Sequence, residues 1–344
     1  NAAMAIAKGE YLGFVDADDF CDLTLFEKAY TKAKSDDADV VIWRYREYEE
    51  VSSKIRREVP LGLPSGIRLP FNGLALSDKI FSTFNFAPWN RIVKRSFAYS
   101  NRLEFQQIDR SNDVVFGCLT LAFALRISVV DEVLYNYRVR ITGNLQSEND
   151  KTPLSIVEAW KFLTQELMRH GVLDKFRRGI VLASMYCFVR TLDVLTECTK
   201  GYSILFDALK TLYEKDSFFA KIQPTEINND IMANALKMIR SSESASAFAI
   251  RWAAEVYKWM SKFYRERESA RKELMATKMD LEATKKELGG TVAELKTLQK
   301  ETQEESESKR LPSVSLIVVS DEGGVCREEL EQHISKSSIV DREI

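Results

Sequence analysis

Three carboxylates come directly after an apolar run near the start of the chain. The segment GEYLGFVDADDF places Asp16, Asp18 and Asp19 at the end of a stretch that is typical of a short buried strand. Like charges this close together raise one another's pKa and cost stability unless a cation or donor groups compensate them. Asp16 and Asp18 are spaced to share a hard divalent cation such as Mg²⁺ or Mn²⁺, since both offer oxygen ligands. The segment therefore predicts a site for a metal and its bound phosphate oxygens, unless Asp19 or Asp22 only caps the next helix and the other two are solvated turn residues.

Two other kinds of acidic site fit this turn less well. In a calcium-binding loop that began at Asp16, Glu27 would hold position 12, but Cys21 stands at position 6, where the loop needs glycine. In a phosphatase with an aspartate nucleophile, a small hydroxyl residue would stand in place of Phe20. Neither alternative accounts for the segment.

The acidic turn lies within about 150 residues that alternate between helical and strand patterns. Residues 1–8 are expected to be helical, YLGFV to be a strand, TLFEKAYTKAKSDD to be an amphipathic helix and ADVVIWRYR to be a second strand. Further along, we expect FAPWNRIVKRSF to be a surface loop, SNDVVFGCLTLAFAL a helix and RISVVDEVLYNYRVR a strand. This order is typical of an α/β fold with a parallel sheet, in which ligands bind beyond the carboxyl ends of the strands. The acidic turn has that position.

Composition narrows the function of the 344-residue chain. A net charge of -2 gives no general attraction to nucleic acid. No run approaches the roughly 18 consecutive apolar residues of a membrane span. The five cysteines are scattered, include no C-x-x-C pair and favour reduced thiols in the cytoplasm. The length predicts about two domains.

The pattern changes after the α/β part. Residues 151–264 are expected to form a helical region, with apolar positions spaced by three and four. Residues 265–311 are charged and carry leucine at every seventh position, so that they form either a weak coiled coil, through which copies of the chain associate, or a solvated helical spacer. We expect Gly289-Gly290 to interrupt the seam of such a coiled coil. Residues 312–344 then begin with a strand, a turn and a helix, as an α/β domain does.

Several segments match sequence patterns in a fixed order. NAAMAIAKGEYLGFVDADDF is similar to RNxGxxxAxGEYIxFxDxDD, FAPWNRIVKRSF to PWNKLYRREF, and SNDVVFGCLTLAFALRISVVDEVLYNYRVR to EDxxF…VxxxLYYYRxR; ADVVIWRY and TGNLQS match a strand and a serine-containing turn of the same series. The chain thereby resembles the family 2 glycosyltransferases. The resemblance implies that residues 1–150 are the later part of a GT-A domain, a Rossmann-like fold that binds nucleotide-diphospho-sugars. Residues 312–344 resemble the family's opening, PxVSVIIPxYN, which implies the start of a second GT-A-like domain.

The resemblance also implies a reaction: inverting, metal-dependent transfer of a sugar from a nucleoside-diphosphate donor to an acceptor hydroxyl, in cell-surface polysaccharide or glycan synthesis. Asp18 and Asp16 would bind Mn²⁺ or Mg²⁺ beside the donor, and Asp113, the aspartate of the family's E-D pair, would be the general base. Its neighbour Asn112 stands where the family usually has glutamate and is expected to contact the acceptor. The other expected contacts are Trp89 and Asn90 for the acceptor, and Asp16, Arg138 and Arg140 for the donor.

From the residues alone, several of these positions have structural alternatives. Asp113 is equally suited to cap the helix that follows it, Trp89 to lie buried beneath a loop, and the two arginines to be solvated at a strand end. The expected acceptor is a glycan or a lipid-linked molecule, and the expected location is the cytoplasm or the inner face of the plasma membrane. We expect the chain to be truncated at both ends and therefore inactive by itself. The alternative function is a non-catalytic scaffold whose helices mediate oligomerisation.

Overall fold

The computed structural model describes residues 1–50, 52–139, 150–195 and 200–309. The chain divides into two compact units, and the boundary falls after Lys262. Three predictions lie outside the described residues: Arg140, the turn TGNLQS at residues 142–147 and the second α/β domain at residues 312–344. They stay predictions.

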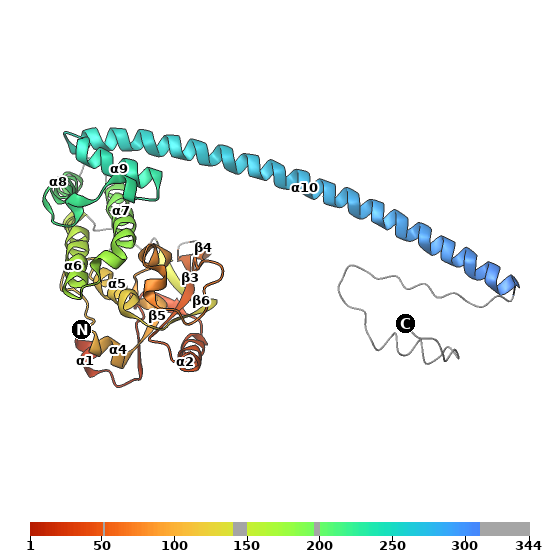
Figure 1. Ribbon diagram of the computed structural model, residues 1–344, viewed down its shortest axis with the longest axis horizontal. Coiled ribbons are helices and arrows are strands. Elements are labelled where there is room, and N and C mark those ends of the chain that lie inside the picture. Colours follow the sequence, from red (N-terminus) through yellow and green to blue (C-terminus); the bar gives the residue numbers. More distant parts are fainter. Residues whose placement is uncertain (51, 140–149, 196–199, 310–344) are drawn as a thin grey trace. The chain divides into compact units, whose positions relative to one another are not determined.

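The first unit is built on a six-stranded mixed sheet (Figure 1). Its strands in sheet order are β1 (Tyr11–Gly13), β5 (Arg91–Lys94), β3 (Val40–Glu49), β6 (Ile127–Val139) and β2 (Phe20–Cys21), and β4 (Lys54–Val59) pairs with β3 off this path. β3 and β6 are parallel from Val40 and Ile127 onward, and the other pairs are antiparallel. The predicted α/β fold is confirmed in this unit, with a mixed sheet in place of a purely parallel one.

The segment FAPWNRIVKRSF, which the sequence predicts to be a surface loop, lies inside the sheet. It contains a 3-10 turn at Pro88–Asn90, then β5 and then helix α4 (Arg95–Ser100). Arg91 and Val93 are 0% exposed, since β5 pairs with β1 on one side and with β3 on the other. The loop prediction is wrong because proline, asparagine and the basic residues conceal a strand of only four residues.

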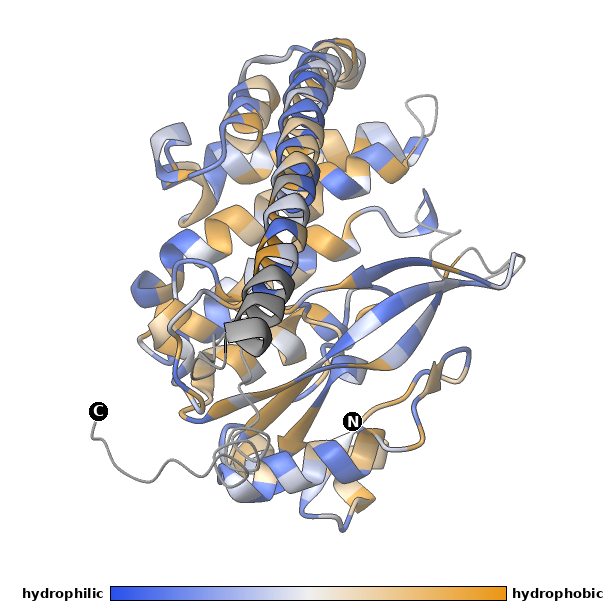
Figure 2. Cartoon of the chain, turned by 90° about the vertical axis from the view of Figure 1, so that its right-hand side faces the viewer, coloured by the Kyte–Doolittle hydropathy of each residue, from blue (hydrophilic) through white to orange (hydrophobic). Residues whose placement is uncertain are grey.

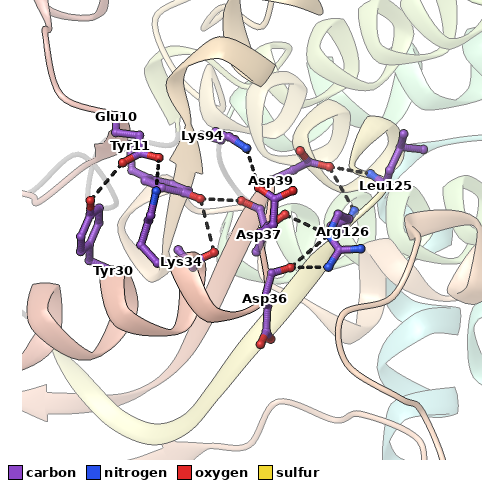
Figure 3. A network of polar contacts seen from close by, with 12 residues as sticks. Glu10, Tyr11, Tyr30, Lys34, Asp36, Asp37, Asp39, Lys94, Leu125 and Arg126 are labelled. Atoms are coloured by element: carbon purple, nitrogen blue, oxygen red, sulfur yellow. Dashed lines mark hydrogen bonds and ion pairs between the residues drawn. The ribbon is translucent and has the colours of Figure 1, made fainter.

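A polar network fixes where β3 and β6 begin (Figure 3). The Asp39 carboxylate accepts the backbone N–H of Arg126 (3.0 Å), and the Arg126 Nε donates to the carbonyls of Asp36 (3.0 Å) and Asp37 (2.9 Å). Lys94 pairs with the carboxylate of Asp37 at 2.8 Å. These contacts join the end of helix α2 (Leu25–Ser35) to the starts of β3 and β6. The two strands therefore run in parallel from the same edge, and their carboxyl ends meet at the opposite edge.

Helices cover both faces of the sheet. On one face α2 (Leu25–Ser35) buries Leu25, Ala29 and Ala33 against Trp43. On the other face α5 (Asp113–Phe123) packs its apolar side chains against the opposite side of β3. This packing positions the first residue of α5, Asp113, near residues 13–16 at the end of β1.

The helical segments that follow β6 share the second of these cores. They are α6 (Ser155–Arg169), α7 (Arg177–Val194), α8 (Lys200–Lys215) and α9 (Asp230–Ser241), and the short helices of the unit are α1 (Ala2–Ile6) and α3 (Ile80–Thr83). Figure 1 shows α6 and α7 side by side next to α5. One hydrophobic cluster includes Val40 of the sheet, Trp160 of α6, Phe188 of α7 and Trp252 near the start of α10 (Ala245–Lys309). The separation of residues 1–150 and 151–264 into two domains stays a prediction.

Helix α10 (Ala245–Lys309) begins in the first unit and makes up the described part of the second. Phe248 and Trp252 are buried in the first unit, whereas the described side chains from Phe263 onward are almost all exposed. In Figure 2 hydrophilic colours dominate this helix, with isolated hydrophobic bands. The helix continues through Gly289-Gly290 without a break. Among the described helices, none is long and apolar enough to cross a membrane.

Candidate active site

The acidic turn connects β1 to β2 and brings three carboxylates together. One carboxylate oxygen from each of Asp16, Asp18 and Asp19 lies within 4.8 Å of the others. A hydrogen bond from the backbone N–H of Asp19 to the carbonyl of Asp16 (3.1 Å) closes the turn. Asp16 and Asp18 are exposed, and Asp19 is half-buried. The three oxygens are close enough to bind one divalent cation, which would relieve their mutual repulsion.

Asp19 is anchored to β6. The Tyr135 hydroxyl donates to one carboxylate oxygen of Asp19 (2.8 Å), and the backbone N–H of Arg138 donates to the other (2.8 Å). The same hydroxyl accepts the backbone N–H of Asp16 at 3.2 Å. Within the described part of the chain, the carboxylates of Asp16 and Asp18 have no such donor. Those two carboxylates are therefore the ones available to a cation, and Asp19 holds the turn in place.

Desolvation raises the pKa of two carboxyl groups in this cluster. It raises the pKa of Asp19 to about 6, although the two hydrogen bonds to β6 lower it. Desolvation and then repulsion from Asp18 raise the pKa of Asp16. Desolvation also raises the pKa of Tyr137 to about 12, so this phenol stays neutral near the cluster. A bound cation would oppose the carboxylate shifts, since it favours their ionised forms.

A cavity of about 610 Å³ opens beside the acidic turn and is lined by residues 13–16, 88–89, 105 and 109–113. It brings together four of the predicted site residues: Asp16, Trp89, Asn112 and Asp113. Asp113 is the first residue of α5, and desolvation raises its pKa to about 6, with a further rise from the charge of Asp16. A carboxylate with that pKa is matched to proton transfer near neutral pH.

Trp89 and Asn90 are adjacent in sequence but border different cavities. Trp89 is 5% exposed, and its indole stacks on the rings of Tyr135 (centroids 4.8 Å apart) and Tyr137 (5.1 Å) while it borders the cavity of Asp113. Asn90 is buried, accepts two hydrogen bonds from Arg91 (both 3.1 Å) and borders a second cavity of about 620 Å³. The acceptor contacts expected of both residues stay predictions, and the structure gives each a packing role as well.

Arg138 reaches the acidic turn through its backbone. Its guanidinium pairs with Glu50 at 3.1 Å and lies 5.2 Å from the ring centroid of Phe20. In the structure, Arg138 contacts the site through its backbone N–H, which donates to Asp19. A contact of the guanidinium with the donor stays a prediction.

The sequence gives no indication of the role of Arg91. Its guanidinium is fully buried and donates to the side chain of Asn90, to the carbonyl of Gly117 (3.1 Å) and to the carbonyl of Asn85. Gly117 lies one turn after Asp113 in α5, so Arg91 ties β5 to the helix that presents Asp113. Desolvation lowers the pKa of Arg91 to about 10, and the negative charge of Asp113 opposes this shift.

The acidic turn lies in a segment that matches a known family model. Residues 1–102 match the family model described as glycosyl transferase family 2. This part of the chain is similar to glycosyl transferase family 2. The family 2 segment includes Asp16, Asp18 and Trp89 and ends before Asp113.

Relatives with curated names are also glycosyltransferases. "Putative glycosyltransferase EpsH" of Bacillus subtilis (strain 168) is 24% identical over 222 residues, which cover 62% of this chain and 61% of the relative. "Glycosyltransferase GlyG" of Streptococcus pneumoniae serotype 4 is 26% identical over 159 residues, which cover 44% of this chain and 50% of the relative. The chain thus spans about three fifths or less of these two relatives. A crystal structure of S. aureus TarS 1–349 aligns with 76% of this chain and 70% of its own, with 16% identity and a TM-score of 0.49.

Proposed function

We propose that the chain is part of an inverting glycosyltransferase, which moves a sugar from a nucleoside-diphosphate donor to an acceptor hydroxyl in polysaccharide or glycan synthesis. The match of residues 1–102 to the family 2 model supports the reaction class. The proposal rests above all on one cavity, which Asp16 of the acidic turn and Asp113 of α5 both line. Asp16 belongs to a cluster that is suited to bind a cation. Asp113 has a pKa of about 6, which suits a general base.

The acidic turn would hold the donor. Asp16 and Asp18 would bind Mn²⁺ or Mg²⁺, since their carboxylates are exposed and no protein donor occupies them in the described part of the chain. When bound, the cation supplies positive charge to the departing diphosphate. Asp19, fixed by Tyr135 and the backbone of Arg138, would keep the other two carboxylates in position.

Asp113 would activate the acceptor. In a single displacement, the acceptor oxygen forms a bond to the anomeric carbon of the sugar as the bond from that carbon to the diphosphate breaks. The proton of the acceptor hydroxyl passes to a carboxylate oxygen of Asp113, and the diphosphate leaves with the bonding pair. A pKa of about 6 leaves Asp113 mostly ionised at neutral pH and still basic enough to accept the proton.

In this proposal residues 1–150 are the later part of a GT-A domain, residues 151–264 a helical region, residues 265–311 a helical spacer or a weak coiled coil, and residues 312–344, which lie outside the described residues, the start of a second GT-A-like domain. Trp89, whose indole stacks on Tyr135 and Tyr137, would contact the acceptor in the cavity of Asp113.

The test compares three variants in the full-length protein that contains this chain. With a panel of nucleoside-diphosphate sugars, nucleoside diphosphate release is measured with and without Mn²⁺. Asp18→Asn should lose both Mn²⁺ binding and release, and Asp113→Asn should lose release while it keeps Mn²⁺ binding. The matched control is Asp131→Asn, an exposed carboxylate on β6 that should change neither. Wild-type rates in the Asp113→Asn variant would refute the assignment of the base, and absence of release from every donor would favour a scaffold.

A further inference from the structure

Beyond the first unit, α10 exposes a regular row of leucines. Leu274, Leu281, Leu288 and Leu295 recur at every seventh position and are 57%, 54%, 58% and 40% exposed. A seven-residue apolar repeat makes a narrow stripe along one side of a helix, which is the pattern of a coiled-coil seam. Since α10 is continuous from Ala245 to Lys309, the stripe is not interrupted.

The repeat assigns every residue of this helix to a heptad position. With the leucines at position a, position d is held by Phe263, Ala270, Thr277, Thr284, Thr291 and Leu298. Gly289-Gly290 falls at positions b and c, away from the a and d seam. The glycine pair therefore does not interrupt the seam, contrary to the expectation from the sequence.

The threonines at position d are compatible with a buried seam. The hydroxyls of Thr277 and Thr284 donate to the carbonyls of Glu273 and Asp280, four residues earlier, at 2.9 Å in both cases. A hydroxyl that is already paired within its own helix needs no partner across an interface. These positions can therefore face a second helix through their methyl groups.

The charges beside the seam favour one orientation. Position g is acidic in three successive heptads and position e is basic in the next: the g residues are Glu266, Glu273 and Asp280, and the e residues are Arg271, Lys278 and Lys285. In a parallel, in-register pair, a g residue of one helix faces the e residue five positions later in its partner. An antiparallel pair would instead place g beside g and e beside e, so that like charges meet.

We propose that α10 forms a parallel, in-register coiled coil with α10 of a second copy of this chain. Glu266 then faces the partner's Arg271, Glu273 the partner's Lys278 and Asp280 the partner's Lys285, and each pair occurs twice across the interface. Exposed ion pairs of this kind set orientation and register more than they add stability, and the leucines at position a supply the burial. The association does not depend on the proposed sugar transfer.

The first experiment measures the mass of the whole chain by light scattering after size-exclusion chromatography. Leu281→Glu with Leu288→Glu should convert the assembly to single chains. Met279→Glu is the matched control, because Met279 is 72% exposed and holds position f, outside the seam. Unchanged thermal unfolding of the first unit would show that the variants still fold. A wild-type chain that is monomeric at tens of micromolar, or a leucine variant with unchanged mass, would overturn the proposal.

The second experiment tests charge and direction. Reversal of the three basic e residues to glutamate should give single chains, and additional reversal of the three acidic g residues to lysine should restore the assembly. Single cysteines at Ala270 and Thr291, both at position d, should each give a disulfide-linked dimer under mild oxidation, beyond the background of the native cysteines. The control Ser269→Cys, at the outward position c, should not. Cross-linking at only one of the two d positions would overturn the parallel register.

Discussion

The buried guanidinium of Arg91 gives the sharpest test of how the fold presents Asp113. Arg91 is 0% exposed and donates four hydrogen bonds to three acceptors: the side chain of Asn90 and the carbonyls of Gly117 and Asn85. Among the described residues Arg91 forms no ion pair, although the negative charge of Asp113 acts on it. Replacement by methionine keeps most of the volume and removes every donor.

The size of the effect follows from these contacts. Each buried acceptor left without a donor costs about 1–3 kcal/mol, so three acceptors cost roughly 3–9 kcal/mol. Removal of a buried charge without an ion-pair partner returns a few kcal/mol of desolvation energy. We therefore expect Arg91→Met to lower the free energy of unfolding by about 3–5 kcal/mol. Arg91→Lys keeps the charge but cannot reach all three acceptors, so its loss should be smaller.

Urea unfolding followed by circular dichroism measures the loss. The matched control is Arg126→Met, because Arg126 also donates to backbone carbonyls, those of Asp36 and Asp37, but is exposed (Figure 3). Water can replace its hydrogen bonds, so the control should lose about 1 kcal/mol or less. Equal losses in the two variants would refute the reasoning that Arg91 anchors α5.

Three further predictions concern the same region. Because the pKa of Asp113 rises from 3.8 to about 6 on folding, the folded chain holds its proton to higher pH, and stability should fall as pH rises from 4 to 6. Asp113→Asn should remove that fall, so the variant should be more stable than wild type by about 1–3 kcal/mol at pH 7 but not at pH 4. If urea titrations gave the same difference in unfolding free energy at both pH values, the prediction would be wrong. Tyr135→Phe leaves Asp19 without one donor and should lower the free energy of unfolding by about 1–2 kcal/mol. It should also weaken Mn²⁺ binding in calorimetry, and unchanged binding would show that the tyrosine does not support the site. Gly117→Ala places a Cβ 1.9 Å from the carbonyl oxygen of Phe86 and should cost several kcal/mol in the same unfolding assay. An unchanged free energy of unfolding would contradict this close packing of α5.

The elements that the sequence predicts well are those with a strong local pattern. β1 and the acidic turn follow from an apolar run that ends in aspartates, and α2 from apolar residues spaced by three and four. β3 and β6 follow from their β-branched runs. In each case the residues that decide the element lie within the element itself.

The contacts that the sequence does not reveal join residues far apart in the chain. Tyr135 holds Asp19 across 116 positions, and Arg91 holds Gly117 across 26. β5 has only four residues and is a strand because β1 and β3 lie on either side of it. Such pairings depend on the sheet order, which no local pattern specifies.

In the function proposed above, the acidic turn binds a divalent cation together with a nucleoside diphosphate. Isothermal titration of Mn²⁺ into the full-length protein that contains this chain, with and without UDP as the probe, tests this binding most directly. We expect one Mn²⁺ site that binds more tightly with UDP. Asp18→Asn should weaken its affinity at least tenfold, about 1.4 kcal/mol, and Asp131→Asn should leave it unchanged. Equal Mn²⁺ affinity in the Asp18→Asn variant and the wild type would contradict it.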